Sequence, residues 1–165
     1  MFRDSSLVPL SHQHQHGLAL SVIIDRSLKA DPAAEKVAEL SRKVATMAEV
    51  ELLGHFKVEE DVLFPSVRAV LDDDGVVDEL ISQHRSMEDL VQRLADAQDV
   101  ERVGILQEFG ELLSRHIRLE ERQLFQEIQA KLAPEELNRL GARIHANVQQ
   151  VCPVTSSLPW DNADR

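Results

Sequence analysis

"HFKVEEDVLFP" at residues 55–65 and "HIRLEERQLFQ" at residues 116–126 share one arrangement, in which a histidine precedes two adjacent glutamates and a Leu-Phe pair. The apolar residues of each stretch are spaced as on the inner face of a helix. Burying ionised side chains on such a face costs several kcal/mol each unless their charge is compensated. Because this costly feature occurs twice, we expect the two stretches to meet inside the fold around something positively charged.

The composition is typical of a water-soluble protein, and the chain is long enough to form its own core. It has 165 residues, and we expect a single domain over residues 1–165. The net charge of −11 argues against nucleic acid or an anionic membrane as a partner, because their phosphate groups would repel the chain. No apolar run approaches the ~20 residues of a membrane span. The single cysteine, Cys152, fits a reducing compartment, so a cytoplasmic protein is expected. The sequence does not indicate its oligomeric state.

Apolar residues recur at steps of three and four, and the chain has no tyrosine and no alternating Val/Ile/Thr runs for strands. The pattern predicts an all-α fold with helices at about residues 8–29, 32–71, 75–94, 99–131 and 134–149. Pro65 should bend the second helix. Short connections favour antiparallel neighbours, and therefore an up-down-up-down four-helix bundle over about residues 8–131. The short fifth helix should pack outside this bundle or against another subunit, and residues 150–165 read as an irregular tail.

Each of the four long helices carries a histidine in its apolar stripe, namely His14, His55, His84 and His116. A step of four residues rotates by only about 40° on a helix, so a glutamate four positions later points the same way as its histidine. Three histidines have one: Glu59, Glu88 and Glu120 follow His55, His84 and His116. The adjacent Glu60 and Glu121 should turn away, toward solvent or supporting partners.

A single histidine of this kind is more often a hydrogen-bonded core residue, and a single glutamate is more often a surface charge. Their recurrence on all four stripes favours a metal centre instead. Mixed imidazole and carboxylate ligands suit iron or manganese, with carboxylates bridging two ions about 3.5–4 Å apart. Structural zinc would more often recruit cysteines.

The first helix offers three histidines in "HQHQH". His12 and His16 lie on one side, and His14 lies opposite, with Leu10 and Leu18. Periodicity favours His14 only modestly as the inward residue. His12 and His16 are expected to be solvated or to line an entrance.

At these residues the sequence resembles the hemerythrin-like, or HHE cation-binding, family. The matching segments are "PLSHQHQHGLAL", "HFKVEEDVLFP", "QHRSMEDL" and "HIRLEERQLF". The resemblance implies two iron ions per chain inside a four-helix bundle, bridged by carboxylates and an oxo or hydroxo group. It also favours His14 in the first helix. It assigns His14 and His55 to one iron, His84, Glu88 and His116 to the other, and Glu59 and Glu120 to the bridges.

Two departures from the oxygen-carrying hemerythrins bear on function. Glu88 stands where they have a second histidine, and the fourth helix ends H-x-x-x-E rather than H-x-x-x-x-D. Added negative charge favours ferric iron and works against reversible oxygen carriage. The resemblance therefore implies a protein that binds or reacts with oxygen, peroxide or nitric oxide, in handling or sensing. The alternatives are a di-iron enzyme with peroxide-dismutating or ferroxidase activity, and an iron-responsive interaction module.

Overall fold

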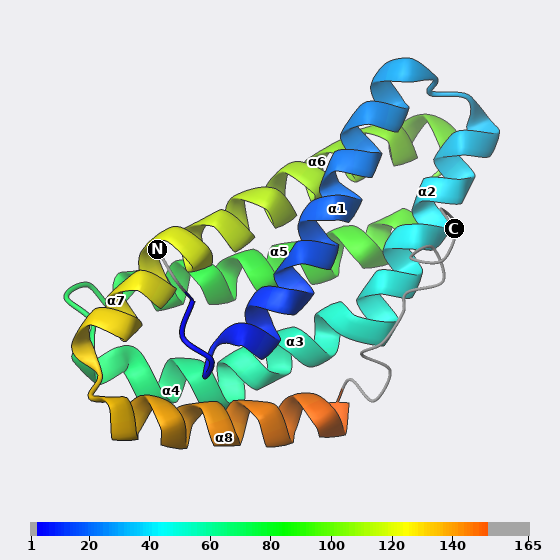
Figure 1. Cartoon of the computed structure of the whole chain (residues 1–165). Helices are drawn as coiled ribbons and strands as arrows, with labels where there is room; N and C mark the ends of the chain where they lie inside the picture. The colour runs from blue at the N-terminus through cyan, green and yellow to red at the C-terminus, as the bar shows by residue number, and fades with distance from the viewer. Residues whose placement is uncertain (1–2, 152–165) are drawn as a thin grey trace.

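The computed structural model describes residues 3–151, which are helical almost throughout and contain no strand (Figure 1). The predicted all-α class is confirmed. The α-helices are α1 (Val8–Ala30), α2 (Ala34–Met47), α3 (Leu53–Val58), α4 (Phe64–Val67), α5 (Gly75–Asp96), α6 (Asp99–Leu119), α7 (Phe125–Lys131) and α8 (Pro134–Val151). Cys152 and most of the expected tail lie outside the described residues.

Two of the predicted long helices are interrupted by π-turns rather than running uniformly. Between α2 and α4 the helical chain passes through η1 (Ala48–Leu52) and η2 (Glu59–Leu63), and it ends in the 3₁₀ turn η3 (Arg68–Val70). Between α6 and α7 it passes through η4 (Glu120–Leu124). A π-turn takes in an extra residue and often marks a functional position. The spacing of apolar residues alone did not reveal these turns.

The second helix begins later than its sequence signal suggested. Asp31 and Pro32 precede α2, and the Asp31 carboxylate accepts a hydrogen bond of 3.0 Å from the backbone N–H of Ala33. Asp31 therefore stabilises the turn before the helix, and regular α-helix starts at Ala34.

The long helices pack against one another as a helical bundle. α1 lies along α6, α5 also packs on α6, and α2 contacts α1, α5 and α6. At Gly17, where α1 meets α6, an added Cβ would lie 2.8 Å from the Cδ1 atom of Ile117. The missing side chain thus lets these two helices approach closely.

Two apolar clusters fill the interior and leave the histidines at their boundary. One cluster joins the second half of α1 to α2, to the end of α5 and to most of α6. The other joins the start of α1 to η2, α4, the start of α5, η4, α7 and α8. Along each long helical segment, residues of one cluster are followed by residues of the other, and the buried histidine lies close to this change. The polar centre is therefore sealed by apolar packing at both ends.

α8 lies on the outside of the bundle beside α3 and α4 (Figure 1), in contact with α3, η2 and α1. Gly141 of α8 meets the segment that leads into α1, and an added Cβ would lie 2.6 Å from the Cα atom of Ser6. Since backbone cannot give way as a flexible side chain can, only glycine fits here. None of the described helices has a stretch long and apolar enough to span a membrane.

Candidate metal centre

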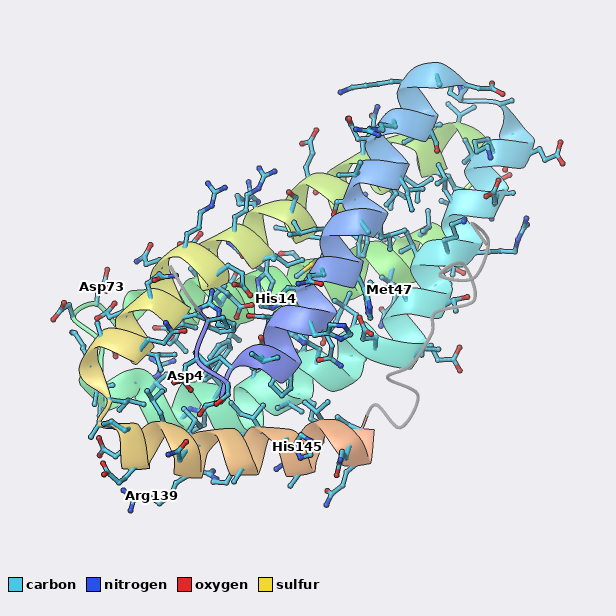
Figure 2. All side chains as sticks on the ribbon, viewed as in Figure 1. Asp4, His14, Met47, Asp73, Arg139 and His145 are labelled. Carbon is cyan, nitrogen blue, oxygen red and sulfur yellow. The ribbon has the colours of Figure 1, made fainter. Side chains whose placement is uncertain are left out.

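Six buried side chains from the four long helices converge in the middle of the bundle. His14, His55, Glu59 and Glu120 form one group of possible metal ligands, and Glu59, His84 and His116 form a second. None of the six is more than 3% exposed. Figure 2 shows His14 among the side chains enclosed by the long helices. The two groups share Glu59, so they are parts of one centre.

The two carboxylates lie between the two groups. Glu59 places Oε1 at 2.9 Å from His55 Nε2 and Oε2 at 3.2 Å from His84 Nε2. Glu120 places Oε2 at 3.0 Å from His14 Nε2 and 3.5 Å from His116 Nε2. Each glutamate thus reaches histidines of both halves of the bundle, as a carboxylate bridging two metal ions does.

The polar atoms at this centre lack the hydrogen bonds that burial normally demands. Both oxygens of Glu59, both oxygens of Glu120 and the Nε2 atoms of His84 and His116 are buried without a hydrogen-bond partner among the described residues. His14 Nε2 faces His55 Nε2 at 3.0 Å. Nearly all buried polar atoms in proteins are paired, so these need an explanation. Metal cations bound between them would satisfy the oxygens and nitrogens together, and the residues present fit such ions.

Two of the four histidines are oriented by carboxylates on their outer side. His14 Nδ1 lies 2.7 Å from Glu121 Oε1, and His84 Nδ1 lies 2.8 Å from Glu60 Oε1. An acceptor at Nδ1 holds the proton there, which leaves the Nε2 lone pair free for a metal. Of the two roles predicted for Glu60 and Glu121, the structure gives the supporting one. Burial would raise the pKa of Glu121, but hydrogen bonds from His14, Ser11 and Arg3 lower it to about 2.

The other two histidines are oriented by amides. His55 Nδ1 lies 2.8 Å from Gln13 Oε1, and His116 Nδ1 lies 3.0 Å from Gln83 Oε1. Sequence reasoning missed both glutamines, although a signal was present. Each directly precedes a candidate ligand, in "QH" at residues 13–14 and again at 83–84. Together with the repeated H-x-x-x-E-E, this shows that both halves of the bundle carry the same set of orienting groups.

The π-turns help to place adjacent glutamates on opposite sides of one histidine, at Nε2 and at Nδ1. η2 begins at Glu59 and η4 begins at Glu120. A π-turn holds more residues than an α-turn, so successive side chains are rotated by less from one another. Glu59 can therefore face the centre while Glu60 reaches the outer side of His84.

Glu88 is the one predicted ligand that the structure does not bring to the centre. Its Oε1 atom lies 3.0 Å from Arg85 Nη1, and its side chain is 32% exposed. It belongs to neither group of possible ligands among the described residues. Glu88 follows His84 by four residues, and the rotation of about 40° over that step is enough to carry it from the centre to the rim.

On the first helix the structure distinguishes the three histidines. His14 is 3% exposed and points to the centre, whereas His12 is exposed. His16 lies outside both groups, with Nδ1 at 2.9 Å from Glu51 Oε2. This arrangement agrees with the preference for His14.

Burial and the close approach of charges set the protonation of the centre. Burial and the neighbouring Glu59 raise the pKa of Glu120 above its ordinary value. Burial lowers the pKa of His116 well below its ordinary value. Burial would also lower the pKa of His14, but the neighbouring carboxylates of Glu120 and Glu121 raise it well above 6.5. Burial would raise the pKa of Glu59, but His55 and His14 beside it lower it well below its ordinary value. In metal-free protein the protonated forms of His14 and Glu120 are thus favoured, and a bound metal would displace these protons.

A cavity of about 10 Å³ adjoins the centre, beside His14, His55 and His116. Its other walls are mostly apolar, with Met47 and Leu113 among them. This volume is about that of one water molecule. A molecule of two or three non-hydrogen atoms would need only small side-chain movements to enter.

Comparison with known proteins gives one significant match. A family model described as the hemerythrin HHE cation binding domain matches residues 8–128. The matched range contains all four histidines and both carboxylates of the centre. No curated protein and no solved structure matches the chain significantly.

Proposed function

The chain belongs to the hemerythrin HHE cation-binding family, and from this premise we propose that its centre holds two iron ions and binds or reacts with oxygen, peroxide or nitric oxide. His14 and His55 would hold one ion, His84 and His116 the other, and Glu59 and Glu120 would bridge them. The proposal treats the four long helical segments as the up-down-up-down bundle in which such centres are built. Glu88 remains a predicted ligand that substitution can test.

The observation that carries this proposal is the set of buried atoms without partners. Four carboxylate oxygens and two imidazole nitrogens lie at one place in the core, and none of them has a hydrogen bond. Leaving a buried polar group unsatisfied costs about 1–3 kcal/mol, and more when the group is charged. Six such atoms would be a heavy cost in a centre without metal, and they become ligands once cations are present.

The types of ligand support iron as the metal. Imidazole nitrogen suits iron, copper, nickel and zinc, whereas carboxylate oxygen suits harder cations such as manganese. A centre of four imidazoles and two bridging carboxylates lies between these preferences, where iron is favoured and manganese is the main competitor. The only cysteine of the chain, Cys152, is outside the segment that the family model matches.

Iron bound here would supply redox chemistry with small molecules. The protein would limit the size of the molecules that reach the iron and would hold the ligands in position. The cavity beside His14, His55 and His116 has room for about one water, so it favours diatomic molecules and peroxide over organic substrates. Glu60 and Glu121 hold the protons of His84 and His14 on Nδ1. Gln13 and Gln83 do the same for His55 and His116. The ligands are therefore oriented before metal binds.

The test is metal analysis of protein produced with ample iron and purified without oxygen, followed by optical spectra with oxygen, nitric oxide and peroxide. We expect two irons per chain and a lasting spectral change with at least one of the three molecules. One tightly bound zinc per chain, or no metal, would overturn the proposal. Sustained consumption of peroxide would identify an enzyme, and binding of a partner only in the presence of metal would identify an interaction module.

A further inference from the structure

A third buried glutamate lies near the centre without belonging to it. Glu51 is 5% exposed and is not among the possible metal ligands of the described residues. It lies in η1, the one π-turn that carries no residue of the centre. The other two π-turns begin at Glu59 and Glu120. Burying a carboxylate costs free energy that burying an apolar residue would not. The position of Glu51 therefore suggests a function.

Glu51 lies between the cavity and the surface. It lines the cavity together with His14, His55 and His116, and it is the only carboxylate among the described lining residues. Its two oxygens lie 2.9 and 3.2 Å from Nδ1 of His16.

The outer side of this pair leads toward solvent. The His16 side chain is 18% exposed. The ring of the exposed His12 lies 5.1 Å from the His16 ring, in an edge-to-face arrangement. Glu51 and His16 therefore link the cavity wall to the surface of α1.

We propose that Glu51 and His16 form a gate that controls which small molecules reach the metal centre, a role that rests on the function proposed above. In the closed state the two side chains are joined by their hydrogen bond of 2.9 Å. Separating the two side chains opens a passage between α1 and η1 for a molecule of two or three atoms. Because the Glu51 carboxylate lies on this passage, it repels anions and admits neutral molecules such as oxygen, nitric oxide or hydrogen peroxide.

The gate predicts different effects for removing its bulk and removing its charge. In iron-loaded protein, Glu51→Ala should raise the association rates of nitric oxide and of azide by about tenfold or more, since a buried hydrogen bond to a charged group no longer has to break. Glu51→Gln keeps the shape and removes the charge, so it should raise the rate of azide much more than that of nitric oxide. Glu49→Ala is the matched control, since Glu49 is an exposed glutamate of the same π-turn, and it should leave both rates unchanged. Stopped-flow absorbance measures the rates, and metal analysis should give two irons in every variant.

Three results would overturn the gate. The first is unchanged association rates in Glu51→Ala with its iron retained. The second is loss of iron from both Glu51 variants, which would make Glu51 a metal ligand. The third is an equal rise in Glu51→Ala and Glu49→Ala, which would indicate general loosening of η1.

A measurement without metal separates failure of the gate from failure of the iron proposal. In metal-free full-length protein, xenon should shift the methyl NMR signals of Leu113 and Ile117, which line the cavity, in Glu51→Ala and not in the unmodified chain. If the unmodified protein binds no iron but xenon enters only the variant, the proposed function fails and the gate stands. If xenon shifts the signals equally in both proteins, the gate fails.

Discussion

Replacing Glu120 by leucine should make the metal-free protein more stable and the metal-loaded protein less stable. Glu120 is fully buried, both its oxygens lack hydrogen bonds, and it shares the centre with Glu59. The substitution preserves approximate volume and removes one of the two buried carboxyl groups of the centre. Glu59 keeps its contacts of 2.9 Å with His55 and 3.2 Å with His84. His14 loses its contact with Glu120 but keeps Glu121 at 2.7 Å, so no charge is left without a partner.

The size of the effect follows from the cost of burying charge. Exchanging buried ionic groups for apolar residues of similar volume has stabilised proteins by about 1–4 kcal/mol. For a domain of this length each kcal/mol shifts Tm by roughly 2–4 °C, so a rise of several degrees is expected with a chelator present. With metal, the unmodified chain gains about 4 kcal/mol at a free metal concentration a thousand times its Kd. The variant lacks one bridging ligand and should gain far less, so the order of stability reverses.

Thermal and urea unfolding followed by circular dichroism, with chelator and with ferrous iron under anaerobic conditions, measure this reversal. Glu88→Leu is the matched control, because its carboxylate is paired with Arg85 at the rim. It should change stability little in either condition. If Glu120→Leu is the less stable protein even with chelator, then the buried carboxylate stabilises the metal-free fold and the reasoning from desolvation is wrong.

Further substitutions test the ligand set, its orientation and the fold. His14→Ala should lose iron, whereas His12→Ala should keep nearly two per chain, as metal analysis will show; equal loss would place the centre on the other face of α1. The structure predicts that Glu88→Gln keeps both irons, and loss of one would support the ligand role drawn from the sequence. Gln13→Leu removes the acceptor of the His55 Nδ1–H and should weaken metal binding about 10–100-fold in a competition titration. An unchanged metal affinity would show that the Gln13 amide does not orient His55. Gly141→Val should lower Tm through collision with the backbone of Ser6, and an unchanged Tm would mean that this segment can move aside.

The sequence predicted the helices and most of the centre largely because both depend on periodicity, although the choice of His14 rested mainly on the family resemblance. A histidine on each apolar stripe must meet the others once four amphipathic helices bury those stripes against one another. The same reasoning gave the inward direction of Glu59 and Glu120, since both follow a stripe histidine by four residues.

Periodicity failed where small rotations or local backbone changes decide the outcome. Glu88 has the same spacing from its histidine as Glu59 and Glu120, yet it lies beside Arg85, partly exposed. The step from histidine to glutamate is α-helical at Glu59 and Glu120 as well, since their backbone N–H groups donate to the carbonyls of His55 and His116. The difference therefore lies in how each helix is rotated about its axis, which a 3.6-residue period does not resolve. The orienting glutamines were missed for another reason, since a polar residue next to a ligand is read as a surface position.

The two halves of the centre are chemically alike, so any difference between metal ions bound in them would come from the groups behind the histidines. Glu121 and Glu60 are each bound by an arginine, Arg3 in one half and Arg85 in the other. Arg3 lies over the Phe125 ring with its side chain 17% exposed, whereas the Arg85 side chain is 54% exposed. An exposed ion pair is screened by water and holds its carboxylate less firmly than a buried one. His84 itself is enclosed by the rings of Phe56 and Phe64, with centroids 3.9 and 5.9 Å away. The asymmetry between the two halves therefore lies in the arginines at the surface of the bundle rather than among the histidines.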